Sequence, residues 1–289
     1  MKKLLIALLL IFSAFVGLIV LMGALALLTP AWSSSTEGLL FMQGFQTIAL
    51  FGVTAFVGVW YTEDREDPIE KMLLKKGLTL KQGAIAILFA VAALPMISLL
   101  AEWNKGMELP QFLASMEEMM REMEESSKVL TERFLNTTSE WMLFVNLLVM
   151  ALLPAVCEEM MFRGWLQRAL GRSVDYHTAI WVSAIVFSAI HFQFYGFIPR
   201  MLIGAALGYL YYYTGSLWAP IVAHFTNNAA AVVTAFLSYN GYTSIDFDLI
   251  GTGDTWYLSV ASVAVCVALM VRLQSTDNRL QSTDVSGIC

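Results

Sequence analysis

The chain has little charge for its size. Only 14% of its 289 residues are Asp, Glu, Lys or Arg, whereas about a quarter of the residues in a soluble domain are charged. Hydrophobic residues make up 58% of the chain, and the mean hydropathy is +0.66. This composition excludes an ordinary soluble domain and predicts a membrane protein.

Basic residues and cysteines are also scarce. The 17 Lys and Arg are outnumbered by 23 Asp and Glu, so the net charge is −6 and nothing supports nucleic-acid binding. Most acidic residues fall in loops, and we interpret the excess as solvated surface. The three cysteines, Cys157, Cys266 and Cys289, have neither metal-ligand nor disulfide spacing. They therefore indicate no particular redox compartment.

Long apolar runs fill most of the chain. A helix needs about 20 apolar residues to cross roughly 30 Å of hydrocarbon, and lipid offers unpaired backbone groups no hydrogen bonds. We therefore predict an all-α polytopic membrane protein, a bundle of about eight transmembrane helices. Their expected ranges are 4–28, 39–60, 83–102, 141–171, 178–195, 199–213, 217–238 and 255–272. The first is expected to be retained, because its apolar run exceeds the roughly 7–15 residues of a signal peptide.

The basic residues are unequally divided between the two sides of this bundle. With the N-terminus in the cytosol, eleven of the 17 lie in cytosolic segments and five outside, and Arg163 is left within the membrane. This bias predicts that both termini face the cytosol. We favour a cell membrane over the endoplasmic reticulum, although Lys-rich loops fit either, and the sequence gives no oligomeric state.

Two polar segments interrupt the apolar pattern. Residues 104–140 include the stretch 116–125, where five glutamates are interleaved with four methionines at roughly helical spacing, which predicts an amphipathic external helix. We interpret it as a solvated connector in preference to a lid over a cavity. The tail repeats RLQSTD at 272–277 and 279–284. We expect this polar tail to be disordered.

Two adjacent glutamates and an arginine stand inside an apolar run, in VCEEMMFRGW. A charge at membrane depth is costly, so it is by default a functional-site hypothesis. Glu159 and Arg163 are four residues apart and share a helix face, the spacing of an ion pair. Glu158 is turned by about 100° from its neighbour. We therefore expect Arg163 to hold Glu159 and Glu158 to face another group.

Two of the three histidines lie in neighbouring apolar runs. At 1.5 Å per residue from their shared turn, Glu158 and His191 both lie about 20 Å deep, so they can face each other. His224 lies about 10 Å deep and reaches them only if its helix tilts or kinks. Asn228 follows His224 by one turn, and Phe187 precedes His191 by one turn.

These side chains suit hydrolysis. A carboxylate can take a proton from a water that an imidazole positions, and Glu158 with His191 fits these roles. His224 and Asn228 fit the electrophilic side, which stabilises an oxyanion on a scissile carbonyl. A second assignment stays open, in which Glu158, His191 and His224 hold a zinc ion. No HExxH motif decides between them, and His177, in a connecting loop, is given no role.

The three motifs together resemble those of the CPBP family of intramembrane proteases, also called the CAAX prenyl protease or Abi family. EEMMFR is similar to the family's EExxxR, FSAIH to its FxxxH and HFTNN to its HxxxN. The resemblance covers roughly residues 141–238. The count of eight helices also resembles the prenyl-protein endopeptidase branch.

The resemblance implies a bundle with a cavity open to the cytosolic side and to the bilayer. In it Glu158 activates water with the help of His191, while His224 and Asn228 form the oxyanion hole. Glu159 and Arg163, with Phe187, support the site. The family has been classed both as metalloproteases and as glutamate proteases, so a zinc cofactor stays open. The implied partners are the lipid bilayer and a membrane-anchored substrate, such as a prenylated CaaX protein that loses its last three residues.

Two other functions compete with a protease. Some members of the resembled family act in bacteriocin immunity, so a non-catalytic immunity or scaffolding protein is the alternative. A proton-coupled transporter would also use intramembrane carboxylates, but the halves show no internal repeat. We divide the chain into N-terminal helices, the external segment, a catalytic membrane core, and the last helix with a cytosolic tail. These parts are 1–103, 104–140, 141–238 and 239–289.

Overall fold

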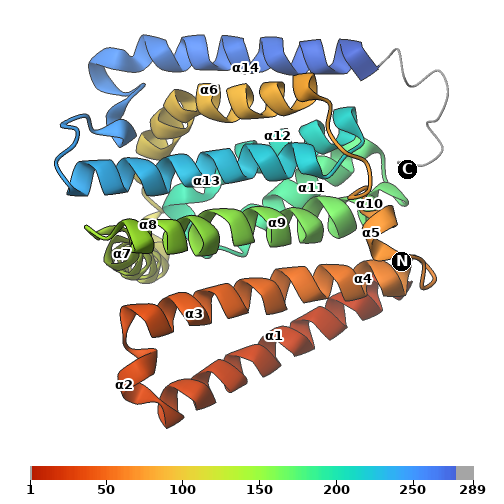
Figure 1. Cartoon of the computed structure of the whole chain (residues 1–289), viewed down its shortest axis with the longest axis horizontal. Coiled ribbons are helices and arrows are strands. Elements are labelled where there is room, and N and C mark those ends of the chain that lie inside the picture. Colours follow the sequence, from red (N-terminus) through yellow and green to blue (C-terminus); the bar gives the residue numbers. More distant parts are fainter. Residues whose placement is uncertain (1, 278–289) are drawn as a thin grey trace.

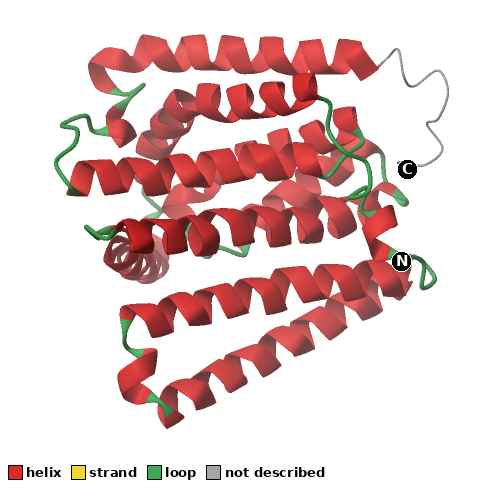
Figure 2. Cartoon of the chain, in the orientation of Figure 1, coloured by secondary structure: helices red, strands yellow, loops and turns green. Residues whose placement is uncertain are grey.

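The structure is a computed structural model and describes residues 2–277. Across this range the chain is helical, and it contains no strand (Figure 2). The long elements are α1 (Lys2–Leu28), α3 (Thr36–Thr47), α4 (Thr54–Thr62), α6 (Leu80–Lys105), α7 (Ala114–Leu135), α8 (Glu140–Asn146), α9 (Leu153–Glu159), α11 (Tyr176–Ala189), α12 (Phe197–Thr214), α13 (Trp218–Tyr239) and α14 (Trp256–Asp277). The short helical turns are α2 (Pro30–Ser33), α5 (Pro68–Lys71), α10 (Arg168–Gly171), η2 (Gln111–Leu113), η5 (Phe194–Gly196), η6 (Phe247–Leu249) and η7 (Gly253–Thr255).

Three π-helical segments join some of these elements into longer rods. They are η1 (Ile48–Val53), η3 (Leu147–Leu152) and η4 (Met160–Gln167). Within residues 2–277, five helices are long and apolar enough to cross a membrane, namely 36–62, 80–105, 140–171, 218–239 and 253–275. Shorter apolar helices cover 13–28 and 176–189. An all-α polytopic membrane protein is thereby confirmed, and a helix stands in each of the eight predicted ranges.

Most of the long helices run in roughly the same direction, whereas α7 lies across them and is seen end-on (Figure 1). α6 packs between α13 and α14, and α13 packs on α9 and η3, whereas α11 and α12 pack on each other. α1 and α4 form a hairpin that meets the rest of the bundle where α4 packs on η4. The N-terminal end of α1 and the C-terminal end of α14 lie at one end of the bundle, and α7 lies at the other.

Close packing fixes the N-terminal hairpin against the polar core. Trp165 of η4 is 1% exposed and lies over Gly58, where an added Cβ atom would come within 2.8 Å of the indole ring. Its Nε1 donates a hydrogen bond to Oγ1 of Thr62 at 3.2 Å. Only glycine at residue 58 lets the two helices approach this closely, and so this pair positions α4 beside η4.

Two expectations about element ends were wrong. The helix expected over 178–195 ends at Ala189, and His191 lies in the turn that follows. Phe192 has a φ of 53°, a left-handed conformation that ends a helix. The first RLQSTD copy, 272–277, was expected to be disordered but continues α14. The second copy, 279–284, lies outside the described residues.

Candidate active site

Glu159 is fully buried and joins two helices through one oxygen. Its Oε1 lies 2.8 Å from Nη1 of Arg163 and 2.7 Å from Nδ1 of His224 on α13. The ion pair with Arg163 confirms the prediction from their spacing. The bond to His224 was not predicted, because it links residues far apart in sequence. A carboxylate only accepts hydrogen bonds, so Nδ1 of His224 must carry the proton.

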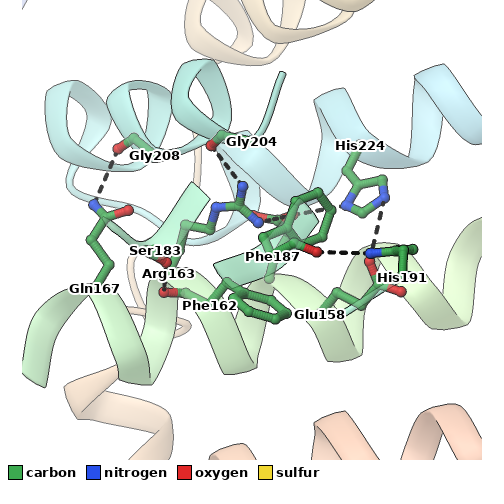
Figure 3. Close-up of polar contacts among 11 residues, drawn as sticks. Glu158, Phe162, Arg163, Gln167, Ser183, Phe187, His191, Gly204, Gly208 and His224 are labelled. Carbon is green, nitrogen blue, oxygen red and sulfur yellow. Dashed lines mark hydrogen bonds and ion pairs between the residues drawn. The ribbon is translucent and has the colours of Figure 1, made fainter. Parts of the chain in front are cut away.

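Phe187 of α11 lies at the centre of the polar cluster (Figure 3). Its ring centroid is 5.1 Å from that of His191 and 6.1 Å from that of His224, both in edge-to-face geometry. The guanidinium carbon of Arg163 lies 4.8 Å from the same ring. One buried aromatic ring therefore sets the positions of both imidazoles and of the arginine.

His191 caps the end of α11. Its Nδ1 lies 2.7 Å from the carbonyl oxygen of Phe187, one turn earlier in the chain. A carbonyl only accepts, so Nδ1 donates, and Nε2 of the neutral ring keeps a free lone pair. The four-residue spacing of FxxxH is the spacing that lets the histidine reach the carbonyl at the helix end.

Glu158 faces a cavity instead of the ion pair. The cavity has a volume of about 670 Å³, and Glu158 and His191 both line it. Oε2 of Glu158 lies 3.9 Å from Nε2 of His224, too far for a hydrogen bond. Most of the other lining side chains are apolar and come from α1, η1, η4, α11 and the turn after α11: Phe15, Leu50, Phe51, Met161, Phe162, Trp165, Leu166, Val186, Ile190 and Phe192. The polar Gln43, Gln46 and Thr47 of α3 complete this part of the wall.

The external helix α7 contributes to this cavity, since Ser127 is part of its wall. The half-buried face of α7 also includes Glu117, Met120 and Glu124, and Phe134 is 3% exposed. Most of α7 is exposed, as expected for a solvated connector, but Ser127 also places part of this helix over the cavity. Ser127 belongs to α7, which lies at the end of the bundle opposite the described termini (Figure 1). The side of the membrane on which the cavity opens stays a prediction.

The loop between α11 and α12 is held by α6 and α7. Asn104 is 1% exposed. Its Nδ2 donates to the carbonyl of Phe194 at 3.2 Å, and its Oδ1 accepts from the amide of Ile198 at 2.9 Å. These two bonds fix both ends of η5, the turn that follows His191. Nothing in the sequence around Asn104 marked it, because its partners lie about 90 residues away.

A second clamp joins η5 to α7. Glu117 accepts hydrogen bonds from Nη2 of Arg121 at 2.6 Å and from the hydroxyl of Tyr195 at 3.4 Å. The guanidinium of Arg121 also lies 4.6 Å from the centre of the Tyr195 ring. The hydrogen bond from Arg121 is the largest cause that lowers the pKa of Glu117, followed by the bond from the amide of Leu109. The clamp thus favours an ionised Glu117.

Two glycines of α12 allow polar side chains of η4 to reach its backbone. Arg163 donates from Nη2 to the carbonyl of Gly204 at 2.7 Å, and Gln167 donates to the carbonyl of Gly208 at 3.3 Å. A Cβ atom at residue 208 would lie 2.7 Å from Oε1 of Gln167. This contact was not predicted from the sequence, although two glycines four residues apart are a known signal of closely packed membrane helices.

Two other polar residues lie outside this hydrogen-bonded cluster. Asn228 follows His224 by one turn on α13, and its Oδ1 lies 3.5 Å from Nδ2 of Asn227. The structure therefore gives Asn228 no contact with Glu158 or His191. His177 begins α11, and its Nδ1 lies 2.8 Å from the hydroxyl of Tyr209. This contact agrees with the expectation that His177 has no role in the site.

The histidine nitrogen atoms suit zinc, but the positions of the three proposed ligands do not. Nδ1 of both His191 and His224 is used in a hydrogen bond, which leaves Nε2 free and suits a zinc ligand. The positions do not suit one ion, since residues 2–277 contain no group of three His, Cys, Asp or Glu side chains that could hold a metal. The residues as placed thus do not fit zinc, and no reaction step is derived through it.

Two comparisons with known proteins match the part of the chain that carries this site. The profile of the family described as type II CAAX prenyl endopeptidase Rce1-like matches residues 140–230. The uncharacterized protein YpbD of Bacillus subtilis (strain 168) is 35% identical over 88 residues, which are 29% of this chain and 42% of that protein. The match therefore spans less than half of that relative. No solved structure matches the chain significantly.

Proposed function

Because residues 140–230 carry the domain of the Rce1-like type II CAAX prenyl endopeptidase family, we propose that this protein is an intramembrane endopeptidase. The main observation behind the proposal is that two adjacent carboxylates have different surroundings. Glu159 is 0% exposed and bonded to Arg163 and His224, whereas Glu158 lines the cavity beside His191. One carboxylate is structural, and the other is free to act on a substrate.

In the proposed reaction Glu158 is the general base. It takes a proton from a water in the cavity, and Nε2 of His191 accepts the water's second hydrogen bond. The hydroxide oxygen then attacks the scissile carbonyl, and Glu158 returns the proton to the leaving amine. The hydrogen bond from Nδ1 of His191 to the carbonyl of Phe187 supports this role, because it fixes the imidazole with the lone pair of Nε2 pointing away from the helix end.

His224 is the proposed oxyanion donor. With Nδ1 bonded to Glu159, the ring can donate from Nε2 only when it is protonated. A protonated His224 balances the local charge, since Arg163 and His224 then offset Glu158 and Glu159. The donor faces Glu158, 3.9 Å from its carboxylate. Asn228 is proposed as a second donor, one turn further along α13, once a substrate occupies the cavity.

The substrate proposed is a peptide anchored in the membrane by an apolar group, such as a prenylated CaaX peptide that loses its last three residues. The cavity wall supports this, because its aliphatic and aromatic side chains from α1, η1 and η4 can pack against a lipid chain. The protein is accordingly expected in a cell membrane, where it contacts lipid directly.

The test is cleavage of a prenylated CaaX peptide by the detergent-purified full-length protein. Mass spectrometry should show loss of the last three residues with wild type. Glu158→Gln removes the base without removing the side chain and should lower kcat by about 10²- to 10⁴-fold. Gln167→Ala, which alters a polar contact at a distance from the cavity, is the control for general damage.

The same assay tests whether cleavage requires zinc and whether the protein is catalytic at all. Unchanged cleavage after treatment with a zinc chelator is expected for a glutamate-type protease. Loss on chelation with recovery on adding Zn²⁺ would instead assign Glu158, His191 and His224 as ligands. If neither the wild type nor the variant cleaves any membrane peptide, the non-catalytic immunity or scaffolding protein becomes the better description.

A further inference from the structure

Arg200 stands beside the proposed catalytic residues without a part in their hydrogen-bond network. It lies in the first turn of α12, nine residues after His191. Its Nη2 donates to Oε1 of Gln193 at 2.5 Å. The guanidinium lies over Gly196, where an added Cβ atom would be 2.9 Å from Nη2. The turn that follows His191 therefore packs directly against this side chain.

One nitrogen of the Arg200 guanidinium has no hydrogen-bond acceptor in the described part of the chain. Nη1 of Arg200 is buried and has no hydrogen-bond partner among residues 2–277, and the same is true of Oε2 of Glu124 on α7. Arg200 precedes Gly204 by one turn on α12, and the carbonyl of Gly204 accepts from Arg163, so Arg200 lies on the face of α12 that meets the rod carrying Glu158. Arg200 is thus a half-buried cation with donor capacity left over, next to the turn that carries His191.

A carboxylate is the group that such a donor fits best. The guanidinium presents its N–H groups in a planar fork that matches two carboxylate oxygens, and a charge-assisted bond of this kind is about twice as strong as a neutral one. The peptide of the proposed reaction carries one obligatory carboxylate, at its C-terminus. A leaving tripeptide spans at most about 10 Å from the scissile bond to that carboxylate.

We propose that Arg200 binds the free C-terminal carboxylate of the peptide whose bond Glu158 cleaves, and thereby restricts cleavage to the end of a chain. This inference rests on the proposed function and names a specificity-determining residue for it.

The test compares two prenylated peptides that differ only at the C-terminus, one with a free carboxylate and one with a carboxamide. Wild type should cleave the free acid with a kcat/KM about 10- to 100-fold higher than the amide. Arg200→Gln should lower the value for the free acid to that of the amide, mainly through KM, and leave the amide unchanged. Arg200→Lys keeps the charge without the fork and should fall between them.

Two controls separate binding from damage. Lys128→Gln removes an exposed cation of α7, whose side chain is 63% exposed, and should keep the full preference. Thermal unfolding identifies any variant that does not fold, and unchanged cleavage of the amide shows that the site is intact. Equal cleavage of both peptides by wild type, or an equal loss on both in Arg200→Gln, would overturn this inference alone. Cleavage of neither by wild type would overturn the proposed function, and this inference with it.

Discussion

Oε1 of Glu159 lies 2.7 Å from Nδ1 of His224, and this contact ties α9 to α13 through two fully or nearly buried groups. The same oxygen also accepts from Arg163. A buried charge is tolerated only with partners, and here one carboxylate has two of them. Glu159 therefore determines the tautomer of His224 and the distance between the helices that flank the cavity.

Replacing Glu159 should affect stability and activity together. Glu159→Gln leaves the Arg163 guanidinium buried without its counter-charge, a change that costs about 3–5 kcal/mol in comparable buried pairs. Cleavage should also fall, because His224 loses the carboxylate that orients its ring. Thermal unfolding in detergent and peptide cleavage measure the two effects.

Glu158→Gln is the matched comparison, because it alters the neighbouring carboxylate that faces the cavity. It should lose activity with little change in unfolding temperature. An unfolding temperature for Glu159→Gln equal to that of Glu158→Gln would refute the division of roles between the two glutamates.

Asn104 should matter for activity through the loop that it holds. Asn104→Ala removes two hydrogen bonds and leaves the amide of Ile198 and the carbonyl of Phe194, both in partly buried residues, without this partner. Each buried unsatisfied group costs about 1–3 kcal/mol. The turn after His191 should loosen, and kcat/KM should fall by about tenfold or more because the water-positioning ring is no longer fixed.

Gln167→Ala controls for this loss of stability. Gln167 is also buried and bonded to a backbone carbonyl, that of Gly208, but it touches neither His191 nor η5. It should lower the unfolding temperature and spare kcat/KM. Equal kinetic losses in the two variants would show that Asn104 has no specific effect on the site.

The helices and the three motifs could be predicted because each depends on neighbours in sequence. Apolar runs of membrane length must be helical, and the spacing of Glu159 and Arg163 places them on one face. The spacing of Phe187 and His191 likewise reports a contact one turn apart. The assignment of Glu159 to structure and Glu158 to the cavity followed from this local geometry.

The remaining contacts of the site join segments that are distant in sequence, and no local sequence pattern predicts them. The bond from His224 to Glu159 spans 65 residues, and the bonds of Asn104 to the loop span 90 or more. The contact of α7 with the cavity was not favoured for a related reason. Exposed glutamates and methionines make up much of its sequence, whereas its half-buried residues are few, among them Glu124 and Ser127, of which Ser127 lines the cavity.

The clamp between α7 and η5 should be sensitive to acid. The bond from Arg121 lowers the pKa of Glu117 below its ordinary value of 4.5. A group with a lowered folded pKa contributes stability above its unfolded pKa and loses it as the pH falls through the folded value. The clamp should therefore hold at neutral pH and open below about pH 4.5. Hydrogen exchange of α7 amides, corrected for intrinsic rates, measures the opening.

Glu117→Gln is the control for this pH effect. The other charged or titratable groups near the clamp are Arg121, Tyr195, Glu108 and Glu124. Exchange from α7 in Glu117→Gln should already be raised at neutral pH and should change less on acidification. If wild type and variant respond to acid alike, another carboxylate controls the opening.

The side of the membrane that the cavity faces can be read by labelling two positions at opposite ends of the bundle. Lys75 lies on the end with the described termini and Lys128 on α7, and their side chains are 58% and 63% exposed. In a background where Cys289 is replaced by Ser, Cys157 and Cys266 stay buried and should not react. A membrane-impermeant maleimide should label Lys128→Cys on intact cells and leave Lys75→Cys unlabelled, because the distribution of basic residues places the termini inside.

That result would mean that the cavity, with Ser127 in its wall, faces the outer side and takes peptides presented there. The reverse labelling would contradict the orientation predicted from charge and place α7, the carboxylate-binding Arg200 and the cavity on the cytosolic side, where prenylated proteins are anchored.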